Sequence, residues 1–487
     1  MDVINKYDQV EQYLRQAITA GIYQTDDKLP SIRQLSSDLQ VSKNTVIRAY
    51  QELEAIGFIY SVAKSGYRVS LAKSSSNQLS TDQHKPIKVD LLSVCKSILT
   101  YSSEKELLPT GSAHPNINFP AIKSLYAEIG RHARMQSQLP SHYQIPPGNN
   151  LLIKQLLKIS YDLGVPAKYN EIAVTHGAQQ GISLALRALT NKGDIVAVES
   201  PCYFGNLLLM ESLGLKVIEI PSCVTTGINP EALGKAVSLW DIKAIIVTPN
   251  FANPTGSQMP LENRKALLNI SKDIPIIEDD VFGSLGFNEN LPSLKSLDTQ
   301  DRVIYVNSLS KTLDSRLRIG WILSGRYQQK IEKYLISDNM GSLNLMQSAV
   351  AEFLTTGKYR SHTNRMRRLY QTNGKRLHQQ LTHYLNQYPL LQGQFHLTQA
   401  TGSFIMWLTL PDYVDGHQLS LECKQEKISV YPGMAFGTNN KFNHCLRLTY
   451  ANLEGSQSEQ QAIENLARLI NHHCQKQQKS IKQQRSK

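Results

Sequence analysis

Seven short apolar runs rich in β-branched residues recur between residues 172 and 323, and most of them are separated by enough chain for a helix. Strands that alternate with helices build a mainly parallel sheet with helices on both faces, which is the α/β fold class. Ligands of such sheets bind beyond the carboxyl ends of the strands, so polar residues just after these runs are candidates for a site. The runs are Ile172–Thr175, Ile195–Val198, Val217–Ile220, Ala244–Thr248, Pro275–Glu278, Val303–Asn307 and Gly320–Leu323.

The composition excludes several classes of protein. The chain has 487 residues, of which 41% are hydrophobic and 19% are charged, as in globular proteins with more than one domain. No apolar run approaches the roughly 18 residues of a membrane span, and the first residues lack the apolar segment of a signal peptide. The six cysteines are scattered, so we expect neither a disulfide scaffold nor a metal site. These features predict a cytoplasmic protein without a membrane partner, and the net charge of +12 permits a polyanionic one.

Changes in texture along the chain predict four segments. Residues 1–70 carry dense helical periodicity and end in short β-like stretches, whereas residues 71–90 are polar and rich in Ser, as in a flexible linker. Residues 91–473 contain the seven apolar runs and form the main α/β domain. Residues 474–487 hold five basic residues and no acidic one, which predicts a disordered basic tail.

Apolar positions with helical spacing predict three helices in residues 1–70, and two β-like segments joined around Gly66 predict a two-stranded wing. This order is the plan of a winged helix-turn-helix domain. The third helix begins after Ser42, a plausible N-cap. The alternative is a small helical adaptor with a solvated polar face, which the near-neutral charge of the module would suit. Side chains that can hydrogen-bond base edges and phosphates stand near the start of the third helix at Lys43, Asn44, Thr45 and Arg48.

Four segments of this module resemble the GntR-type winged-helix signature. They are Gly21-Ile22-Tyr23, Lys28-Leu29-Pro30-Ser31-Ile32-Arg33-Gln34-Leu35, Val41-Ser42-Lys43-Asn44-Thr45-Val46 and Ala49-Tyr50-Gln51-Glu52-Leu53-Glu54. The resemblance implies that double-stranded DNA is a partner and that Gly66 forms the wing tip. Lys43 stands where the family more often has Arg, which weakens the case for a bidentate contact to guanine there. The implied DNA contacts are Arg33, Lys43, Thr45 and Arg48.

Polar motifs follow several of the expected strands in the main domain. The backbone amides of Ala178 and Gln179 open a helix after the first run and would face an anion. Asp279 ends the fifth run, and buried acids are costly unless they have a partner. Each motif alone has an ordinary explanation, because turns often contain Gly and most lysines lie on the surface. The others are Glu199-Ser200-Pro201-Cys202-Tyr203, Asn250-Phe251-Ala252-Asn253-Pro254-Thr255-Gly256, and Asn307-Ser308-Leu309-Ser310-Lys311 followed by Arg318.

Together these residue types are the ones that pyridoxal phosphate needs. A lysine must form a Schiff base with its aldehyde, and a carboxylate must keep the pyridine nitrogen protonated. A helix N-terminus holds the phosphate, and an aromatic ring covers the pyridine face. The set, in this order, resembles the fold-type-I pyridoxal-phosphate enzymes, the class I and II aminotransferases, over about residues 105–470. The resemblance implies a mainly parallel seven-stranded sheet and a smaller C-terminal α/β subdomain.

The resemblance also assigns roles to individual residues. Lys311 would be the Schiff-base lysine, Asp279 the partner of the pyridine nitrogen, and Asn253 a donor to the ring oxygen. Arg447, in Leu446-Arg447-Leu448-Thr449, would clamp a substrate carboxylate. Tyr143 would be lent to the phosphate site of the partner in a homodimer. The stacking ring would be Tyr203, and the phosphate would be held by Ser308, Arg318 and the amides of Ala178 and Gln179.

The sequence departs from the family beyond Asp279. Aminotransferases usually place a Tyr two or three residues after this acid, and its hydroxyl also meets the ring oxygen of the cofactor. Here Val281 and Phe282 stand at those positions and cannot donate a hydrogen bond. We expect the cofactor to bind but its reactivity to be altered.

A winged helix joined to an aminotransferase-like domain resembles the MocR subfamily of bacterial transcriptional regulators. The resemblance implies a homodimer that binds an operator and senses an amine or amino acid through pyridoxal phosphate. Two alternatives stay open, an active aminotransferase with an appended DNA-binding domain and a dimerising scaffold without cofactor. The presence of Lys311 and Asp279 disfavours the scaffold. A stretch without acids from Lys358 to Arg376 is either a solvated helix face or an auxiliary DNA surface.

Overall fold

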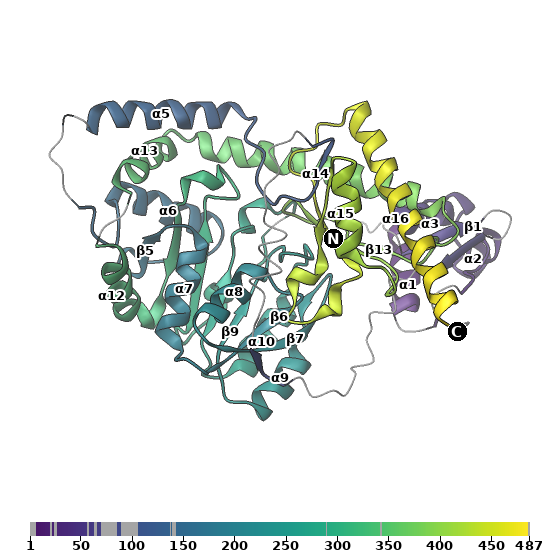
Figure 1. Ribbon diagram of the computed structural model, residues 1–487, viewed down its shortest axis with the longest axis horizontal. Helices are drawn as coiled ribbons and strands as arrows, with labels where there is room; N and C mark the ends of the chain where they lie inside the picture. Colours follow the sequence, from purple (N-terminus) through teal and green to yellow (C-terminus); the bar gives the residue numbers. More distant parts are fainter. Residues whose placement is uncertain are drawn as a thin grey trace.

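The computed structural model describes residues 6–19, 22–23, 27–55, 58–62, 66–69, 85–88, 106–136, 138, 143–288, 290–340 and 343–485. A large α/β body makes up most of the molecule, and a small N-terminal module stands at one end of it (Figure 1). The predicted linker up to residue 84, the wing turn at Lys64-Ser65 and Gly21 of the N-terminal signature lie outside these ranges. Within them, no helix combines the length and the apolar character that crossing a membrane requires.

The N-terminal module has the three helices and the wing that its periodicity predicts. Ser31 and Ser42 cap the second and third helices, because their hydroxyls accept hydrogen bonds from the amides of Gln34 and Thr45 at 3.2 and 3.1 Å. Its core contains Val10, Leu14 and Ile18 of the first helix and Val46, Tyr50 and Leu53 of the third. The elements are α1 (Lys6–Thr19), α2 (Ile32–Asp38), α3 (Lys43–Ala55) and the antiparallel pair β1 (Ile59–Val62) and β2 (Gly66–Val69).

The seven predicted strands form the central sheet, and the α/β class is confirmed. The sheet has nine strands because two short ones join its edge, in the order β3-β7-β6-β9-β10-β11-β12-β5 with β8 on β7. Of the seven, β12 alone runs in the direction opposite to the other six. The strands are β3 (Ile87–Lys88), β5 (Ile172–Thr175), β6 (Ile195–Ser200), β7 (Lys216–Cys223), β8 (Gly227–Ile228), β9 (Ile242–Val247), β10 (Ile276–Asp279), β11 (Val303–Ser308) and β12 (Gly320–Leu323).

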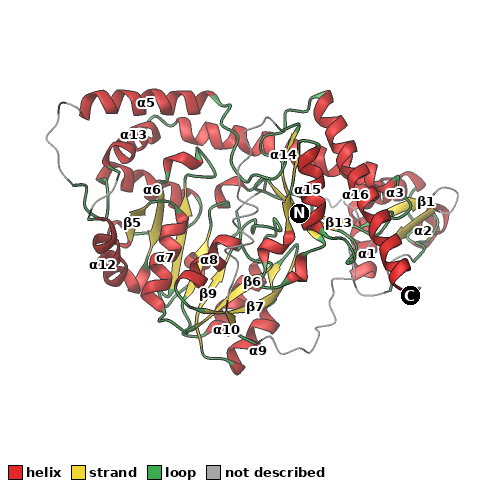
Figure 2. Ribbon diagram, in the orientation of Figure 1, coloured by secondary structure: helices red, strands yellow, loops and turns green. Residues whose placement is uncertain are grey.

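Helices cover both faces of this sheet, as its two-sided apolar strands require (Figure 2). One face packs against α7 (Ala178–Leu189), α8 (Phe204–Ser212) and α12 (Gln328–Asn339). The other face packs against α5 (Pro120–Gln136), α6 (Asn150–Asp162), α9 (Pro230–Leu239), α10 (Leu261–Ser271), α11 (Leu294–Leu297) and α13 (Asn344–Thr355).

The smaller C-terminal α/β subdomain is also present. Its antiparallel sheet has the order β13-β14-β17-β16, and β4 pairs with β15 beside it. The elements are β4 (Leu108–Pro109), α14 (Lys358–Asn386), β13 (His396–Leu397), β14 (Ile405–Thr409), α15 (Gly416–Gln425), β15 (Ile428–Ser429), β16 (Tyr431–Pro432), β17 (Cys445–Thr449) and α16 (Gln457–Arg485).

Two expected segment edges are wrong. Ile87–Lys88, which the sequence places in the linker, forms β3 and extends the sheet beside β7. The expected disordered tail is instead the end of α16, which is helical to Arg485. The reason is that the apolar face of α16 continues to the buried Cys474, and Gln478 beyond it donates to the Tyr413 hydroxyl at 3.1 Å.

Candidate cofactor site and DNA-binding surface

Lys311 lies in the turn that follows β11, at the carboxyl edge of the sheet. Its Nζ donates to the Ala113 carbonyl at 2.8 Å and lies 5.8 Å from the centroid of the Phe282 ring. Burial, together with the cations Arg447 and Arg318, lowers the pKa of Lys311 to about 8, and Asp279 opposes this shift. The amine is therefore neutral in a substantial fraction of molecules near pH 8, which is the form that attacks an aldehyde.

Asp279 ends β10 and faces the same space. Its side chain is buried, and its Oδ1 accepts one long hydrogen bond, 3.3 Å, from the amide of Val281. Burial raises the pKa of Asp279 to about 7, with a further rise from Asp280 that Lys311 counteracts. A buried carboxylate with so little hydrogen bonding suits a cationic partner, and a protonated pyridine nitrogen is such a partner.

A buried network behind Asp279 fixes the end of β10. The neighbouring Asp280 accepts hydrogen bonds from the Tyr305 hydroxyl at 2.6 Å and from Asn250 Nδ2 at 2.7 Å. Arg264 in turn donates to Asn250 Oδ1 at 2.6 Å, and its side chain is fully buried. The acids Glu278, Asp279 and Asp280 are all buried, so they do not form a solvated loop. The sequence signal for this buried network was the presence of polar residues at the ends of two neighbouring strands.

The N-terminus of α7 forms a cradle for an anion. Gly177 precedes it with φ = 83°, and a Cβ there would lie 2.6 Å from Arg318 Nη2. Arg318 also donates to the His176 carbonyl at 3.2 Å, so its guanidinium stands beside the amides of Ala178 and Gln179. The predicted phosphate donors therefore converge on one helix end.

Ser308 ends β11 beside this cradle, because it pairs with Gly320, where an added Cβ would lie 2.8 Å from the amide nitrogen of Ala178. The hydroxyl of Ser308 lies 3.0 Å from the Ile319 carbonyl and 2.9 Å from Ser310 Oγ. Ser310 is not among the predicted site residues, although it stands beside Lys311 and is buried. The sequence signal for Ser310 was its alternation with Ser308 in the same motif.

Tyr203 and Arg447 border the opposite side of the site. Tyr203 precedes α8, and a Cβ on Gly205 would lie 2.5 Å from its ring and 3.0 Å from Gln179 Oε1. The guanidinium of Arg447 lies over the Tyr431 ring at 4.5 Å, and its Nη1 donates to Asn253 Oδ1 at 3.4 Å. The structure thus brings together the side chains of Tyr203, Arg447 and Asn253, which are three of the predicted site residues.

The burial, charge and hydrogen bonding of Arg447 favour the binding of an anion. Arg447 is 2% exposed, and its Nε has no hydrogen-bond partner among the described residues. Burial lowers its pKa to about 10, while the nearby Tyr431 and Tyr203 counteract this shift, so the guanidinium stays charged at neutral pH. A buried cation with a spare donor fits the carboxylate that the resemblance implies.

A loop that sequence reasoning missed crosses the site. The carbonyl of Gly111 accepts a hydrogen bond from Arg447 Nη2, and that of Ala113 accepts the one from Lys311. His114 follows, with its Nδ1 3.0 Å from Ser315 Oγ, and burial together with Lys311 and Arg447 lowers its pKa. The loop has no periodic pattern, and its signal is a Gly-Ser-Ala turn before a proline.

Phe282 occupies the place where the family usually has a hydroxyl. It is 1% exposed and packs edge-on against Phe404, with ring centroids 5.4 Å apart. It therefore presents a ring and no donor to Lys311. Tyr143, in contrast, is 78% exposed and is not brought into the site of its own chain, so its role in a partner subunit stays a prediction.

Most of the predicted DNA contacts are exposed on the winged helix-turn-helix module. Arg33, Lys43, Asn44 and Arg48 are exposed, and Gly66 is exposed with φ = 96°. Arg48 is held over the Tyr7 ring at 4.0 Å. Thr45 is half-buried, and its hydroxyl lies 2.8 Å from Ser42 Oγ, so part of its hydrogen-bonding capacity serves the cap.

Comparison with known proteins supports this arrangement. Residues 126–465 match the family model described as aminotransferase class I and II, and residues 6–69 match that of bacterial regulatory proteins of the gntR family. A protein of Escherichia coli K12 described as the uncharacterized HTH-type transcriptional regulator YjiR is 34% identical over 96% of this chain and 99% of its own. The HTH-type transcriptional regulator NorG of Staphylococcus aureus is 27% identical over 87% of this chain and 95% of its own.

Solved structures share the fold of the main domain. The α-aminoadipate aminotransferase LysN of Thermus thermophilus, complexed with N-(5'-phosphopyridoxyl)-L-leucine, has a TM-score of 0.67 and 24% identity, covering 78% of this chain and 94% of LysN. The kynurenine aminotransferase of Pyrococcus horikoshii, in complex with PMP, has a TM-score of 0.67 and 23% identity, covering 83% of this chain and 99% of its own.

Fold and site together define a DNA-binding regulator built on a pyridoxal-phosphate enzyme fold. The chain belongs to the aminotransferase class I and II family and carries a gntR-family domain, the composition of transcriptional regulators of the MocR type. Pyridoxal phosphate is the cofactor of this family, and the groups around Lys311 fit it.

Proposed function

We propose that this protein is a cytoplasmic transcriptional regulator that binds pyridoxal phosphate at Lys311 and senses an amine or amino acid. The observation that carries the proposal is the convergence of Lys311, Asp279 and Arg447 in one site, on a chain whose helix α3 also exposes Lys43 and Arg48. A dimerising scaffold without cofactor would have no reason to keep a lysine with a lowered pKa near a buried carboxylate. Burial in the site removes hydration from both groups and so costs free energy.

The roles of the residues follow from their positions. When bound, pyridoxal phosphate supplies an aldehyde that holds amines covalently and a ring that withdraws electrons. Lys311 would provide the neutral amine that attaches it, and Asp279 would hold the proton on the ring nitrogen. Asn253 would donate to the ring oxygen, and Tyr203 would cover the ring. Ser308, Arg318 and the amides of Ala178 and Gln179 would bind the phosphate.

The effector is proposed to carry a carboxylate beside its amine. Arg447 is buried, charged at neutral pH and has an unused Nε, so it can bind a carboxylate through a charge-assisted pair. An amine that would replace Lys311 on the cofactor and a carboxylate bound at Arg447 describe an amino acid.

The molecule is proposed to act on DNA as a homodimer. Large apolar side chains are exposed on α5 and the chain on either side of it, which suits burial against a second copy. These residues include Ile117, Tyr126, Met135, Tyr143 and Ile145. Two winged helices would then read an operator with two half-sites.

The alternative is an aminotransferase with an appended DNA-binding domain, and the likeness to solved aminotransferases favours it. Phe282 argues against efficient turnover, because it removes one of two donors to the ring oxygen and so alters proton placement. Amine sensing needs only displacement of Lys311 and does not need that donor. Steady-state turnover near the enzyme median of about 10 per second, with no effect of substrate on DNA binding, would support the alternative.

Substitution of Lys311 tests the proposal. The wild type with added pyridoxal phosphate should show a visible absorption band and a cofactor that borohydride fixes to the chain, whereas Lys311→Ala should show no fixed cofactor. Lys330→Ala is the control, because Lys330 also donates to an alanine carbonyl, that of Ala188, but lies away from the site on α12. A colourless wild type would refute cofactor binding, and a wild type that fails to bind DNA from upstream of its own gene would refute regulation.

A further inference from the structure

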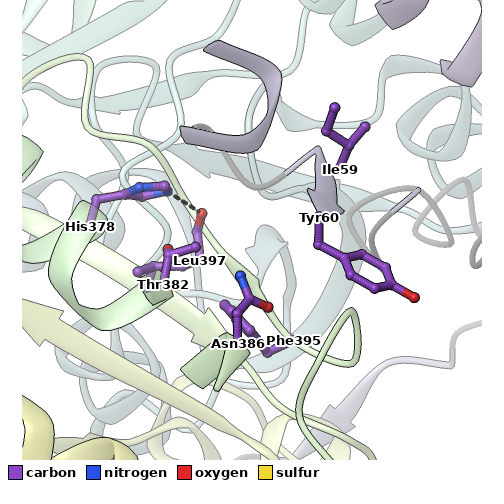
Figure 3. A pocket seen from close by; sticks show the side chains of 7 residues that line it. All are labelled: Ile59, Tyr60, His378, Thr382, Asn386, Phe395 and Leu397. Carbon is purple, nitrogen blue, oxygen red and sulfur yellow. Dashed lines mark hydrogen bonds between the residues drawn. The ribbon is translucent and has the colours of Figure 1, made fainter. Parts of the chain in front are cut away.

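The wing of the N-terminal module packs against the C-terminal subdomain. Tyr60 of β1 is 7% exposed and Ile59 is 1% exposed, although in the part of the chain that the structure describes β1 pairs with β2 alone. Figure 3 shows Ile59 and Tyr60 opposite His378, Thr382 and Asn386 of α14, around a small pocket that Phe395 and Leu397 also line. We call this surface of α14 and residues 392–397 the wing dock.

Gly393 of the wing dock lies directly against the ring of Tyr60. Gly393 has φ = 70°, and a Cβ added to it would lie 2.5 Å from Cε1 of Tyr60. Any larger residue would displace the ring, so the ring and this backbone are in direct contact. Next to it, Gln392 Nε2 donates to the Ser61 carbonyl at 3.1 Å.

This contact also reaches the recognition helix. The amide of Ser61 donates to Glu54 Oε1 of α3 at 2.9 Å, so one residue of the wing bonds to both α3 and the wing dock. Gln51 of α3 and His383 of α14 line the same polar hollow beside it. The position of α3 is therefore tied to that of α14.

The other end of α14 touches the turn that carries Lys311. Tyr359 donates to Thr312 Oγ1 at 2.9 Å, and His362 Nε2 lies 2.8 Å from the Thr312 carbonyl. The helix has 29 residues, so at a rise of about 1.5 Å each it spans about 43 Å without interruption. One helix thus contacts the residue after the cofactor lysine near its first turn, and near its last turns it lines the pocket that Ile59 and Tyr60 of the wing border.

We propose that the wing dock is a regulatory surface whose partner is the wing, and that α14 couples its occupancy to the cofactor site. This inference rests on the proposed function, since it supplies the route from site to DNA. Cofactor binding at Lys311 shifts the Thr312 turn, α14 moves as a unit, and the fit of Tyr60 on Gly393 changes. A well-packed contact of this kind has discrete arrangements and does not deform smoothly.

A matched pair of glycine variants tests the docking in the full chain. Gly393→Ala forces a Cβ into the Tyr60 ring, whereas Gly164→Ala imposes the same backbone strain, at φ = 74°, with no atom within 4 Å. Hydrogen exchange of peptides covering residues 59–62 and 392–397 should accelerate at least about threefold in Gly393→Ala only. In a Tyr60→Ala background, adding Gly393→Ala should cause no further change, because the colliding ring is gone. Equal exchange in the wild type and Gly393→Ala would overturn the docking.

The coupling is read from DNA affinity with and without pyridoxal phosphate. In the wild type and Gly164→Ala, affinity for DNA from upstream of the gene should differ at least about threefold between the two conditions. In Gly393→Ala the difference should fall below about 1.5-fold while the cofactor absorption is retained. No difference in the wild type, or an undiminished one in Gly393→Ala, would overturn the coupling. Failure of the proposed function looks different, because the wild type would then lack the absorption band or DNA binding itself.

Discussion

At the scale of single residues, Lys311 and Asp279 share an unusual charge balance. Burial disfavours the charged form of each, so the pKa of Lys311 falls to about 8 and that of Asp279 rises to about 7. Their mutual attraction works against both shifts. The pair is therefore held close to a change of protonation at physiological pH, whereas an exposed lysine and aspartate would be fully ionised.

This balance predicts the pH dependence of cofactor attachment. The neutral amine of Lys311 is the nucleophile, so the rate at which cofactor-free protein develops the visible band should rise about tenfold per pH unit up to about 8 and then level off. Stopped-flow absorption from about pH 6 to about pH 9.5 measures this profile. A rate that keeps rising towards the pKa of an exposed lysine, about 10.4, would contradict the burial of Lys311.

Arg447 should decide which amines the site binds. Removal of a buried charge partner costs about 2–5 kcal/mol, so Arg447→Ala should weaken amino-acid titration of the absorption band by about 30-fold or more. A simple amine without a carboxylate should titrate equally well in both proteins and serves as the internal control. An unchanged amino-acid titration would place the carboxylate elsewhere.

At the scale of elements, α3 should carry the DNA affinity. Arg48→Ala should weaken binding to DNA and lower the slope of log affinity against log salt by about 0.9 if Arg48 neutralises one phosphate. Arg33→Ala on α2 should behave similarly, and neither change should alter the cofactor absorption. Lys168→Ala, an exposed cation on the main domain, is the matched control. Fluorescence anisotropy at several salt concentrations measures this slope. An unchanged slope in Arg48→Ala and Arg33→Ala would exclude these phosphate contacts.

The elements that the sequence predicted are those with a repeated physical pattern. The seven strands were visible because apolar, mainly β-branched residues line both of their faces, as at the start of Val303–Ser308, whose side chains are all buried. The two-residue β3 has no pattern of its own and forms because Ile87 meets the edge beside Val217. The end of α16 was misjudged because its Gln- and Lys-rich sequence hides partners on α15 and before it, such as Glu422 and Tyr413.

The residues of the candidate site likewise fall into those that could be predicted from the sequence and those that could not. Lys311 and Asp279 follow strands in a recognisable order, so their convergence could be predicted from the topology of the sheet. The loop of Gly111 and Ala113 could not, since only the folded chain brings it across a site made of residues about 200 to 340 positions away. Contacts of this kind depend on tertiary packing, which the short Gly-Ser-Ala sequence of the loop does not specify.

At the scale of the whole molecule, the site is expected to be completed by a second subunit. If Tyr143 serves the partner, Tyr143→Ala and Lys311→Ala should each bind pyridoxal phosphate poorly, but a mixture allowed to exchange subunits should regain part of the affinity. Each hybrid dimer would contain one site with both residues. Absorption titration of the mixture, compared with the average of the separate variants, measures the gain. A mixture that equals the average would show that Tyr143 acts within its own chain or not at all.

The short strand β3 has a consequence for how firmly the wing must bind. It anchors the chain at Ile87 to the main sheet, so the stretch from Val69 can span at most about 60 Å. A tether of that order keeps the wing at an effective concentration in the millimolar range. A contact with an intrinsic dissociation constant near 1 mM, only about 4 kcal/mol, would then be about half populated. A weak interface on a short tether can be shifted in either direction by a small molecule, whereas a strong interface would stay closed whatever the site binds.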